Sequence, residues 1–228
     1  MILTLLSGKK TINKEGRTVA ITSPQVKNQT IEREDRLYPE LVNHLGLNWE
    51  LATNGAIIPA LEQIMLEHDL GVNDFEKFII HTPLIRPGHE SLFLQGILFG
   101  FKEKWDLCGS ILIPQFEDSL RYLLTQRGIL TSSIEDNSTQ EERSINTFFN
   151  NYPEELKKIF GKDIFYELKA LLVRDKNGHG FNLRNLVCHG LISKNEFYTS
   201  SMVYFWWLFF RLTAVPLIKA WSEKNKEK

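Results

Sequence analysis

The stretch over residues 202–218 is almost wholly apolar, and it limits what this chain can fold into more than any other feature. Such a helix must be buried in a protein core or in a bilayer. A membrane-spanning helix needs about eighteen or more residues with few charges, and a central arginine is costly there. Arg211 lies near the middle of the stretch and Pro216 near its end. We therefore expect a buried helix of a bundle; the alternative is a membrane segment.

Apolar residues recur at helical spacing from Asn54 onward. Residues 57–70 and 92–100 each predict an amphipathic helix, and residues 105–126 carry the longest apolar stripe. Further helical patterns follow on both sides of a strong turn at residues 175–178. Nothing repeats internally, and no long alternating stretch predicts a sheet. The expected class is all-α, an antiparallel bundle with short links.

The chain divides by composition into an irregular N-terminal appendage, residues 1–50, and a helical domain, residues 51–228. Within the appendage, residues 16–22 could form a short strand, and Pro24, Asn28 and the charged run 32–36 interrupt the rest. Residues 131–144 are rich in Ser, Thr, Asn, Glu and Asp, which predicts an exposed loop between helices.

Charge and cysteine content limit the possible functions. The 27 basic and 28 acidic residues give a net charge of −1, so any RNA binding must use a local patch. Cys108 and Cys188 lie in apolar surroundings, as expected of reduced thiols. The apolar run at residues 1–6 is too short for a signal peptide, and its charges follow instead of preceding it. We expect a cytoplasmic protein.

Familiar catalytic motifs are absent from the sequence. We find no Gly-rich phosphate loop, no G-x-S-x-G, no C-x-x-C and no H-E-x-x-H. The six histidines never fall at a metal-ligand spacing on one helix with a third candidate nearby. Neither a metal nor a cofactor is expected.

Polar residues that could take part in catalysis or binding are concentrated in residues 178–190. On an ideal helix each residue advances by about 100°, so Asn185 and His189 share a face and the amide can orient the imidazole. Arg184 lies off this face, but its side chain is long enough to reach the same place as the imidazole of His189. Histidine can transfer the protons of RNA cleavage by the ribose 2′-hydroxyl, while a guanidinium holds the phosphate, and no metal is required. The alternative is structural: an arginine bound to carbonyls and a histidine hydrogen-bonded in the core.

This segment resembles the R-x4-6-H signature of the HEPN superfamily, in which a polar residue such as Asn185 usually follows the arginine. More narrowly, R-N-x-x-x-H-G at residues 184–190 is similar to the mark of an HEPN-like family that includes the endoplasmic reticulum membrane-associated RNA degradation protein. A second block agrees, with R-P-G-H-E at residues 86–90, P-Q-F-E at residues 114–117, and Arg121. His89 stands where that family often has arginine. The resemblance covers roughly residues 75–220.

The resemblance implies a four-helix up-and-down bundle that forms homodimers, in which two such motifs meet in one composite cleft. It implies catalytic roles for Arg184 and His189, with Asn185 tuning them. Glu117 and Arg121 are candidates to line the cleft and bind substrate; alternatively they form an internal ion pair that braces two helices.

His179, in the Gly-His-Gly turn before the motif, is a further candidate for substrate binding. The function these residues favour is a metal-independent endoribonuclease that leaves a 2′,3′-cyclic phosphate, serving RNA turnover, stress response or defence. One alternative is a non-catalytic HEPN module that dimerises or binds RNA or nucleotides, which suits the near-zero net charge. Another is a membrane-associated assembly protein that uses the aromatic helix. RNA, a second copy of the chain and a regulatory protein are the expected partners.

Overall fold

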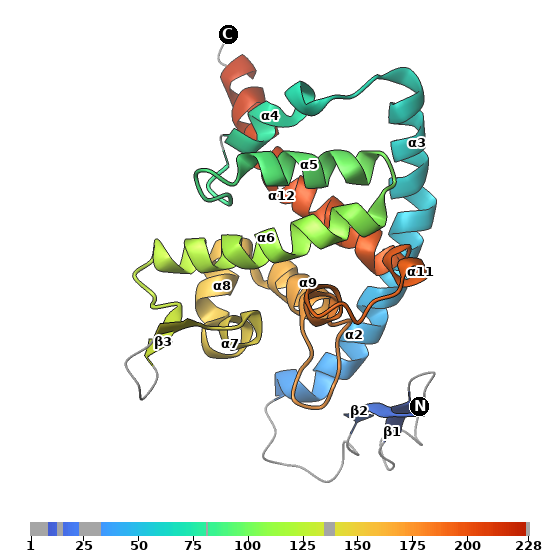
Figure 1. The fold of residues 1–228 in the computed structure, drawn as a ribbon, viewed down its shortest axis with the longest axis vertical. Coiled ribbons are helices and arrows are strands. Elements are labelled where there is room, and N and C mark those ends of the chain that lie inside the picture. The colour runs from blue at the N-terminus through green and yellow to red at the C-terminus, as the bar shows by residue number, and fades with distance from the viewer. Residues whose placement is uncertain (1–8, 13–15, 23–32, 81, 135–139, 227–228) are drawn as a thin grey trace.

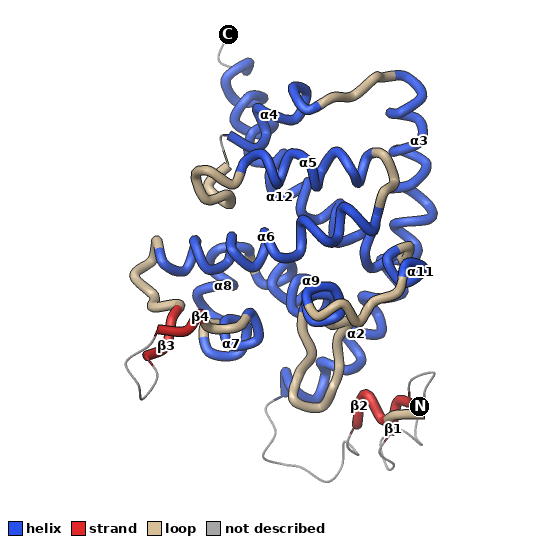
Figure 2. Tube along the Cα trace, viewed as in Figure 1, coloured by secondary structure: helices blue, strands red, loops and turns tan. Residues whose placement is uncertain are grey.

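The computed structural model of the chain describes residues 9–12, 16–22, 33–80, 82–134 and 140–226 (Figure 1). The described residues are mostly helical, in agreement with the predicted all-α class, and include two short antiparallel hairpins (Figure 2). The elements in chain order are β1 (Lys9–Ile12), β2 (Thr18–Thr22), α2 (Arg33–Ala52), the π-helix η1 (Thr53–Ile57), α3 (Ile58–Glu67), α4 (Val72–Ile80), α5 (Glu90–Phe101), α6 (Trp105–Thr125), β3 (Ser132–Ile134), β4 (Gln140–Glu142), α7 (Ile145–Asn151), α8 (Pro153–Phe160), α9 (Lys162–Leu172), α10 (Leu183–Cys188), α11 (Lys194–Phe197) and α12 (Ser200–Lys226).

Helix α6 is the centre of the fold, and it confirms the helix predicted over residues 105–126. Its apolar stripe is buried against α5, α10 and α12, and Figure 1 shows α5 running alongside it. Phe116 is fully buried and meets the rings of Phe205 and Phe209 edge to face, with ring centroids 5.9 Å apart in both pairs. Such pairs add stabilisation to the burial of the rings themselves. The opposite edge of α6 is polar and carries most of the site described below.

Helices α5 and α12 approach each other closely because α5 has a glycine where they meet. A Cβ atom at Gly100 would lie 2.0 Å from Nε1 of Trp206. The same indole nitrogen donates a hydrogen bond to the carbonyl of Ile97, at 3.1 Å, so the buried polar group of Trp206 is satisfied. The contact anchors α12 in the core.

One helical stretch in the described part of the chain, Ser200–Lys219, is long and apolar enough to span a bilayer. Half of it is buried inside the protein, and core helices of soluble proteins meet the same criteria of length and composition. Met202, Phe205, Trp206 and Phe209 are among its buried residues, whereas Arg211 is exposed. This burial agrees with the core helix predicted from the sequence.

Helix α2 crosses the domain boundary that was predicted near residue 50. Tyr38, Val42 and Trp49 are buried in the common core, where Trp49 stacks on Tyr204 of α12 with ring centroids 5.4 Å apart. Residues 33–50 therefore belong to the helical core and not to an appendage. The apolar residues from Tyr38 to Trp49 recur at the spacing of one helix face, but the charged run before them and Pro39 gave the segment the composition of an irregular appendage.

The two hairpins account for the irregular segments. Within residues 16–22, β2 pairs antiparallel with β1, which agrees with the predicted short strand. The segment predicted as an exposed loop, 131–144, instead contains the β3–β4 pair. The hairpin β1–β2 docks on the loop before α10, where the N–H of Ile21 donates to the carbonyl of Asn177 at 2.8 Å. The features expected at residues 1–6, Pro24 and Asn28 lie outside the described residues.

Candidate functional site

Helix α10 is short because glycine and left-handed residues bound it on both sides. Gly180 and Asn182 have positive φ before it, and Gly190 has φ +64 after it. Leu183, the first helical residue, is buried and fixes the start of the helix. The predicted helix thus begins at Leu183 but ends at Cys188, so His189 is the C-cap residue. A glycine directly after the last turn is a common helix terminator.

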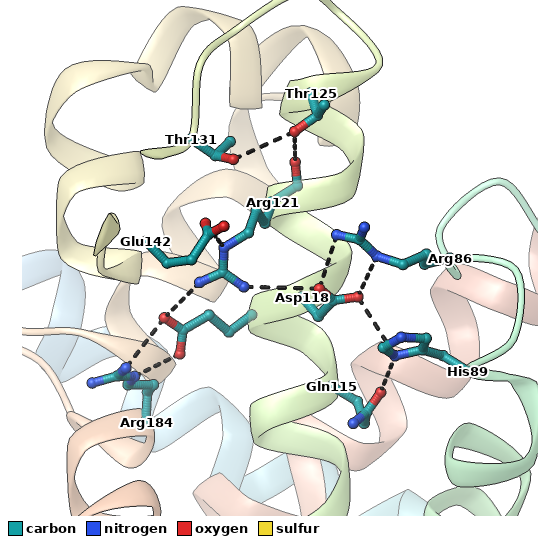
Figure 3. Close-up of polar contacts among 10 residues, drawn as sticks. Arg86, His89, Gln115, Asp118, Arg121, Thr125, Thr131, Glu142 and Arg184 are labelled. Carbon is teal, nitrogen blue, oxygen red and sulfur yellow. Dashed lines mark hydrogen bonds and ion pairs between the residues drawn. The ribbon is translucent and has the colours of Figure 1, made fainter. Parts of the chain in front are cut away.

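Arg184 is held by a buried carboxylate of the central helix. Its Nε donates to Oε2 of Glu117 at 2.7 Å and its Nη2 to Oε1 at 3.2 Å (Figure 3). Glu117 is only 7 % exposed. Burial lowers the pKa of Arg184, but the hydrogen bond and the charge of Glu117 more than offset this and raise it, so the guanidinium stays charged. Such a bidentate pair fixes both position and orientation.

The side chain of Asn185 contacts Arg184, whereas the helical spacing predicted that it would orient His189. Its Oδ1 accepts a hydrogen bond from Nη1 of Arg184, at 3.0 Å. Three of the five N–H groups of the guanidinium are therefore used, which leaves two for a ligand. The side chain of His189 is exposed at the end of α10. Among the described residues, it makes no side-chain hydrogen bond or ion pair.

Arg121 extends the polar cluster along α6, on the same helix as Glu117. Its Nη2 lies 3.6 Å from Glu117 Oε1 and its Nη1 lies 3.8 Å from Asp118 Oδ1. From the β3–β4 hairpin, Oε2 of Glu142 lies 2.8 Å from Nε of Arg121 (Figure 3). The structure therefore brings together four of the predicted site residues, Arg184, Asn185, Glu117 and Arg121.

The loop before α5 continues the cluster on the other side of α6. Arg86 donates from Nε and Nη2 to the two carboxylate oxygens of Asp118, at 2.9 and 3.0 Å. Nδ1 of His89 lies 2.8 Å from Oε1 of Gln115 and 3.5 Å from Asp118 Oδ2 (Figure 3). We call the three arginines Arg86, Arg121 and Arg184, with the three carboxylates Glu117, Asp118 and Glu142, the charge ladder.

Three ladder residues, Arg86, Asp118 and Glu142, were not among the residues predicted for the site, although Arg86 lies in the R-P-G-H-E block. Asp118 could have been found, because it lies three positions before Arg121 and the two therefore share a helix face. Nothing in the sequence connects Glu142 with Arg121, since their contact depends on how the hairpin folds back.

His179 belongs to a different structural unit. Its Nδ1 lies 3.0 Å from Oδ2 of Asp175, and its Nε2 lies 3.0 Å from the hydroxyl of Thr22 on β2. Asp175 also accepts a hydrogen bond from the backbone N–H of His179, at 2.8 Å. The structure thus gives His179 a bracing position between the loop and the N-terminal hairpin, and no contact joins it to the ladder among the described residues.

The neighbouring thiol is not activated. Cys188 is exposed between Val187 and His189, and partial burial is the largest influence on its pKa. The charge of Arg184 lowers that pKa and the charge of Glu117 raises it, and the net shift is upward. The thiolate is the nucleophilic form of cysteine, so Cys188 is a poor candidate for a nucleophile.

Within the described residues, no group of three or more His, Cys, Asp or Glu side chains is placed to hold a metal ion. No family model matches the chain, and no curated protein or solved structure matches it either.

Proposed function

We propose that this chain is a metal-independent endoribonuclease of HEPN type, with Arg184 and His189 as its catalytic residues. The observation that carries the proposal is the arrangement on α10, in which a guanidinium fixed by a buried carboxylate precedes an exposed histidine. The bridge to Glu117 restrains Arg184, and Asn185 restrains it further. Fixed donors stabilise developing charge better than mobile ones, since they need no reorganisation during the reaction.

The chemistry assigns each group one task. A neutral His189 removes the proton of the ribose 2′-hydroxyl, and the 2′-oxygen attacks the adjacent phosphorus. The bond from phosphorus to the 5′-oxygen breaks, and a protonated histidine gives that oxygen its proton. The two remaining N–H groups of Arg184 bind the non-bridging oxygens, whose negative charge increases in the transition state. The products are a 2′,3′-cyclic phosphate and a free 5′-hydroxyl.

The reaction uses one base and one acid, and a homodimer supplies both. In this proposal two copies of α10 meet in one cleft, within a four-helix HEPN-like arrangement, and each contributes its His189. Leu191 supports such an interface, because this apolar side chain lies two residues after His189 and is 68 % exposed. Burying an exposed apolar side chain against a second copy would favour association. The proposal places the protein in the cytoplasm, where both cysteines remain free thiols.

A non-catalytic module that dimerises or binds RNA or nucleotides is the second candidate, favoured by the balance of charge in the ladder. Three arginines face three carboxylates, so the cluster as a whole offers no excess of positive charge to a phosphate. In this case His189 has no chemical role, and Arg184 serves only to hold α10 on α6.

Cleavage of a mixed RNA pool separates the two candidates. Wild-type protein and the variants His189→Ala and His44→Ala are compared in EDTA, and the product ends are mapped. His44 is an exposed histidine of α2, so its removal is a matched control. Cyclic-phosphate ends from the wild type and from His44→Ala, but not from His189→Ala, are the expected result. If His189→Ala cleaves as fast as the wild type, the catalytic assignment is wrong.

A further inference from the structure

The three arginines of the charge ladder are held in different ways. Arg184 and Arg86 each direct two hydrogen bonds to the two oxygens of one carboxylate. The guanidinium of Arg121 makes none among the described residues, and its buried Nε has no hydrogen-bond partner. Its neighbours are ion pairs at 2.8 to 3.8 Å without hydrogen-bond geometry. A buried donor left without a partner costs free energy, so Arg121 is the incompletely satisfied member of the ladder.

The two carboxylates on α6 cannot turn to satisfy Arg121. Glu117 is engaged by Arg184, and Asp118 is engaged by Arg86, both in bidentate geometry. The ring of Phe148, 5.7 Å from the guanidinium carbon, lies on one side of Arg121 and limits its movement. The remaining neighbour is Glu142, which reaches Arg121 from the hairpin and whose side chain is 62 % exposed.

The balance of charge in the ladder also indicates that Glu142 is the group that a ligand can replace. Without Glu142, three arginines face the two carboxylates of α6, which leaves one positive charge without a partner. The carboxylate of Glu142 supplies the balancing negative charge. An ion pair in which one partner is so exposed is weak, because water and salt compete for it. An incoming oxyanion can therefore displace it at little cost.

We propose that Arg121 is a phosphate-binding residue, and that the carboxylate of Glu142 holds the position that a phosphate group of RNA takes when it binds. This inference rests on the proposed function and adds a second phosphate contact to it. Arg184 acts at the scissile phosphate, and Arg121 binds another phosphate of the same strand. Displacing Glu142 exposes the excess positive charge, which reconciles a balanced ladder with binding to a polyanion.

The test measures binding of a fluorescent RNA oligonucleotide whose 2′-hydroxyls are all O-methylated, because the protein cannot cleave it by 2′-oxygen attack. Anisotropy titrations compare the wild type with Glu142→Gln, in EDTA at constant salt. Glu154→Gln is the matched control. Glu154 is similarly exposed, at 68 %, and pairs with Lys157 at 2.9 Å on a different helix. Both substitutions remove one negative charge and one exposed ion pair.

We expect Glu142→Gln to tighten binding about threefold or more, a gain typical of removing one competing surface charge, and Glu154→Gln to change it much less. Arg121→Gln should weaken binding, and in its background Glu142→Gln should bring no gain. Arg121→Lys, which keeps the charge and loses the planar fork, should bind with intermediate affinity if the folded state is intact.

Equal effects of Glu142→Gln and Glu154→Gln, a gain that survives in Arg121→Gln, or no binding by any variant would each overturn the inference. A protein that binds the methylated RNA through Arg121 and yet fails to cleave ordinary RNA would contradict the ribonuclease and retain the phosphate site. The two proposals therefore fail in different experiments.

Discussion

Arg184 and Glu117 form a bidentate bridge between α10 and α6, with donor–acceptor distances of 2.7 and 3.2 Å. Helix α10 has six residues, too few for a helix to be stable by itself in water. Its orientation therefore depends on tertiary contacts, among them this bridge, the burial of Leu183 and the packing of Val187 against the core. The same interaction that positions the proposed catalytic arginine thus also holds the helix that carries it.

Glu117→Ala should lower the free energy of unfolding by about 3 kcal/mol, because it leaves the partly buried Arg184 without its counter-ion. Glu117→Gln retains one hydrogen-bond acceptor and should cost less. Urea unfolding followed by circular dichroism measures both changes. Glu154→Gln removes an exposed carboxylate and should cost about 0.5 kcal/mol or less. Similar losses for Glu117→Ala and Glu154→Gln would show that the bridge contributes no more than a surface ion pair.

Arg184→Ala and His189→Ala should each reduce the rate of RNA cleavage by about a hundredfold or more, because charge stabilisation and proton transfer are both required. If the site is shared between two copies, mixing His189→Ala with the wild type should lower the activity by more than the loss of wild-type chains alone, because a heterodimer has only one of the two histidines. Sedimentation at micromolar concentration should show a dimer for both variants. A strictly monomeric wild type, or activity that falls only in proportion to the share of wild-type chains, would contradict the composite cleft.

Gly100→Ala should destabilise the fold by about 2 kcal/mol or more, since the added methyl group would overlap the indole of Trp206. Gly55 in η1 is a suitable control, because a Cβ there would meet nothing within 4 Å. Gly55→Ala should leave stability unchanged or raise it slightly, through the better helix propensity of alanine. Thermal unfolding of both variants measures the difference, and equal stability would mean that α5 and α12 are less tightly packed than described.

Glu167 should make stability depend on pH. Burial raises the pKa of Glu167, and the hydrogen bond from Tyr204, at 3.1 Å, only partly offsets this. The folded state therefore holds this proton more tightly than the unfolded chain. The contribution to stability is present below the ordinary glutamate pKa and is lost as pH rises through the raised value. Glu167→Gln, which keeps an acceptor for Tyr204, should remove this decline and be more stable than the wild type at pH 7. Urea unfolding of both proteins between pH 4 and pH 7 tests this.

The strongly periodic elements could be predicted from the sequence because one residue pattern determines each of them. The long stripe of α6 and the aromatic segment of α12 are such cases, and burial of these stripes is what the sequence pattern encodes. The position of α2 in the core could also have been predicted, since the apolar residues from Tyr38 to Trp49 recur at spacings of three and four. The charged run before them and Pro39 inside the helix obscured this pattern.

The contacts of the site that lie within one helix could be predicted from the sequence, whereas those between distant segments could not. The pairing of Glu117 with Arg121 follows from their spacing on one helix. That Asn185 turns to Arg184 depends on where α10 ends, and the positive φ of Gly190 determines this end. Gly190 could have predicted the end of the helix, because glycine commonly follows the last helical turn. His189 would then have been placed at the helix end and not on the same helix face as Asn185. The contacts of Arg86 and Glu142 join segments far apart in the chain, and no local pattern predicts them.

The alternation of charge along the ladder has an evolutionary consequence. Each arginine is balanced by a particular carboxylate, so a change at one position leaves a charge without a partner at another. Losing Asp118 alone, for instance, would strand Arg86, and losing Glu117 would strand Arg184. Related sequences should therefore vary at these positions in pairs, Arg86 with Asp118 and Arg184 with Glu117. Arg121 and Glu142 should be less tightly linked, since their pairing is the one that a ligand is proposed to replace.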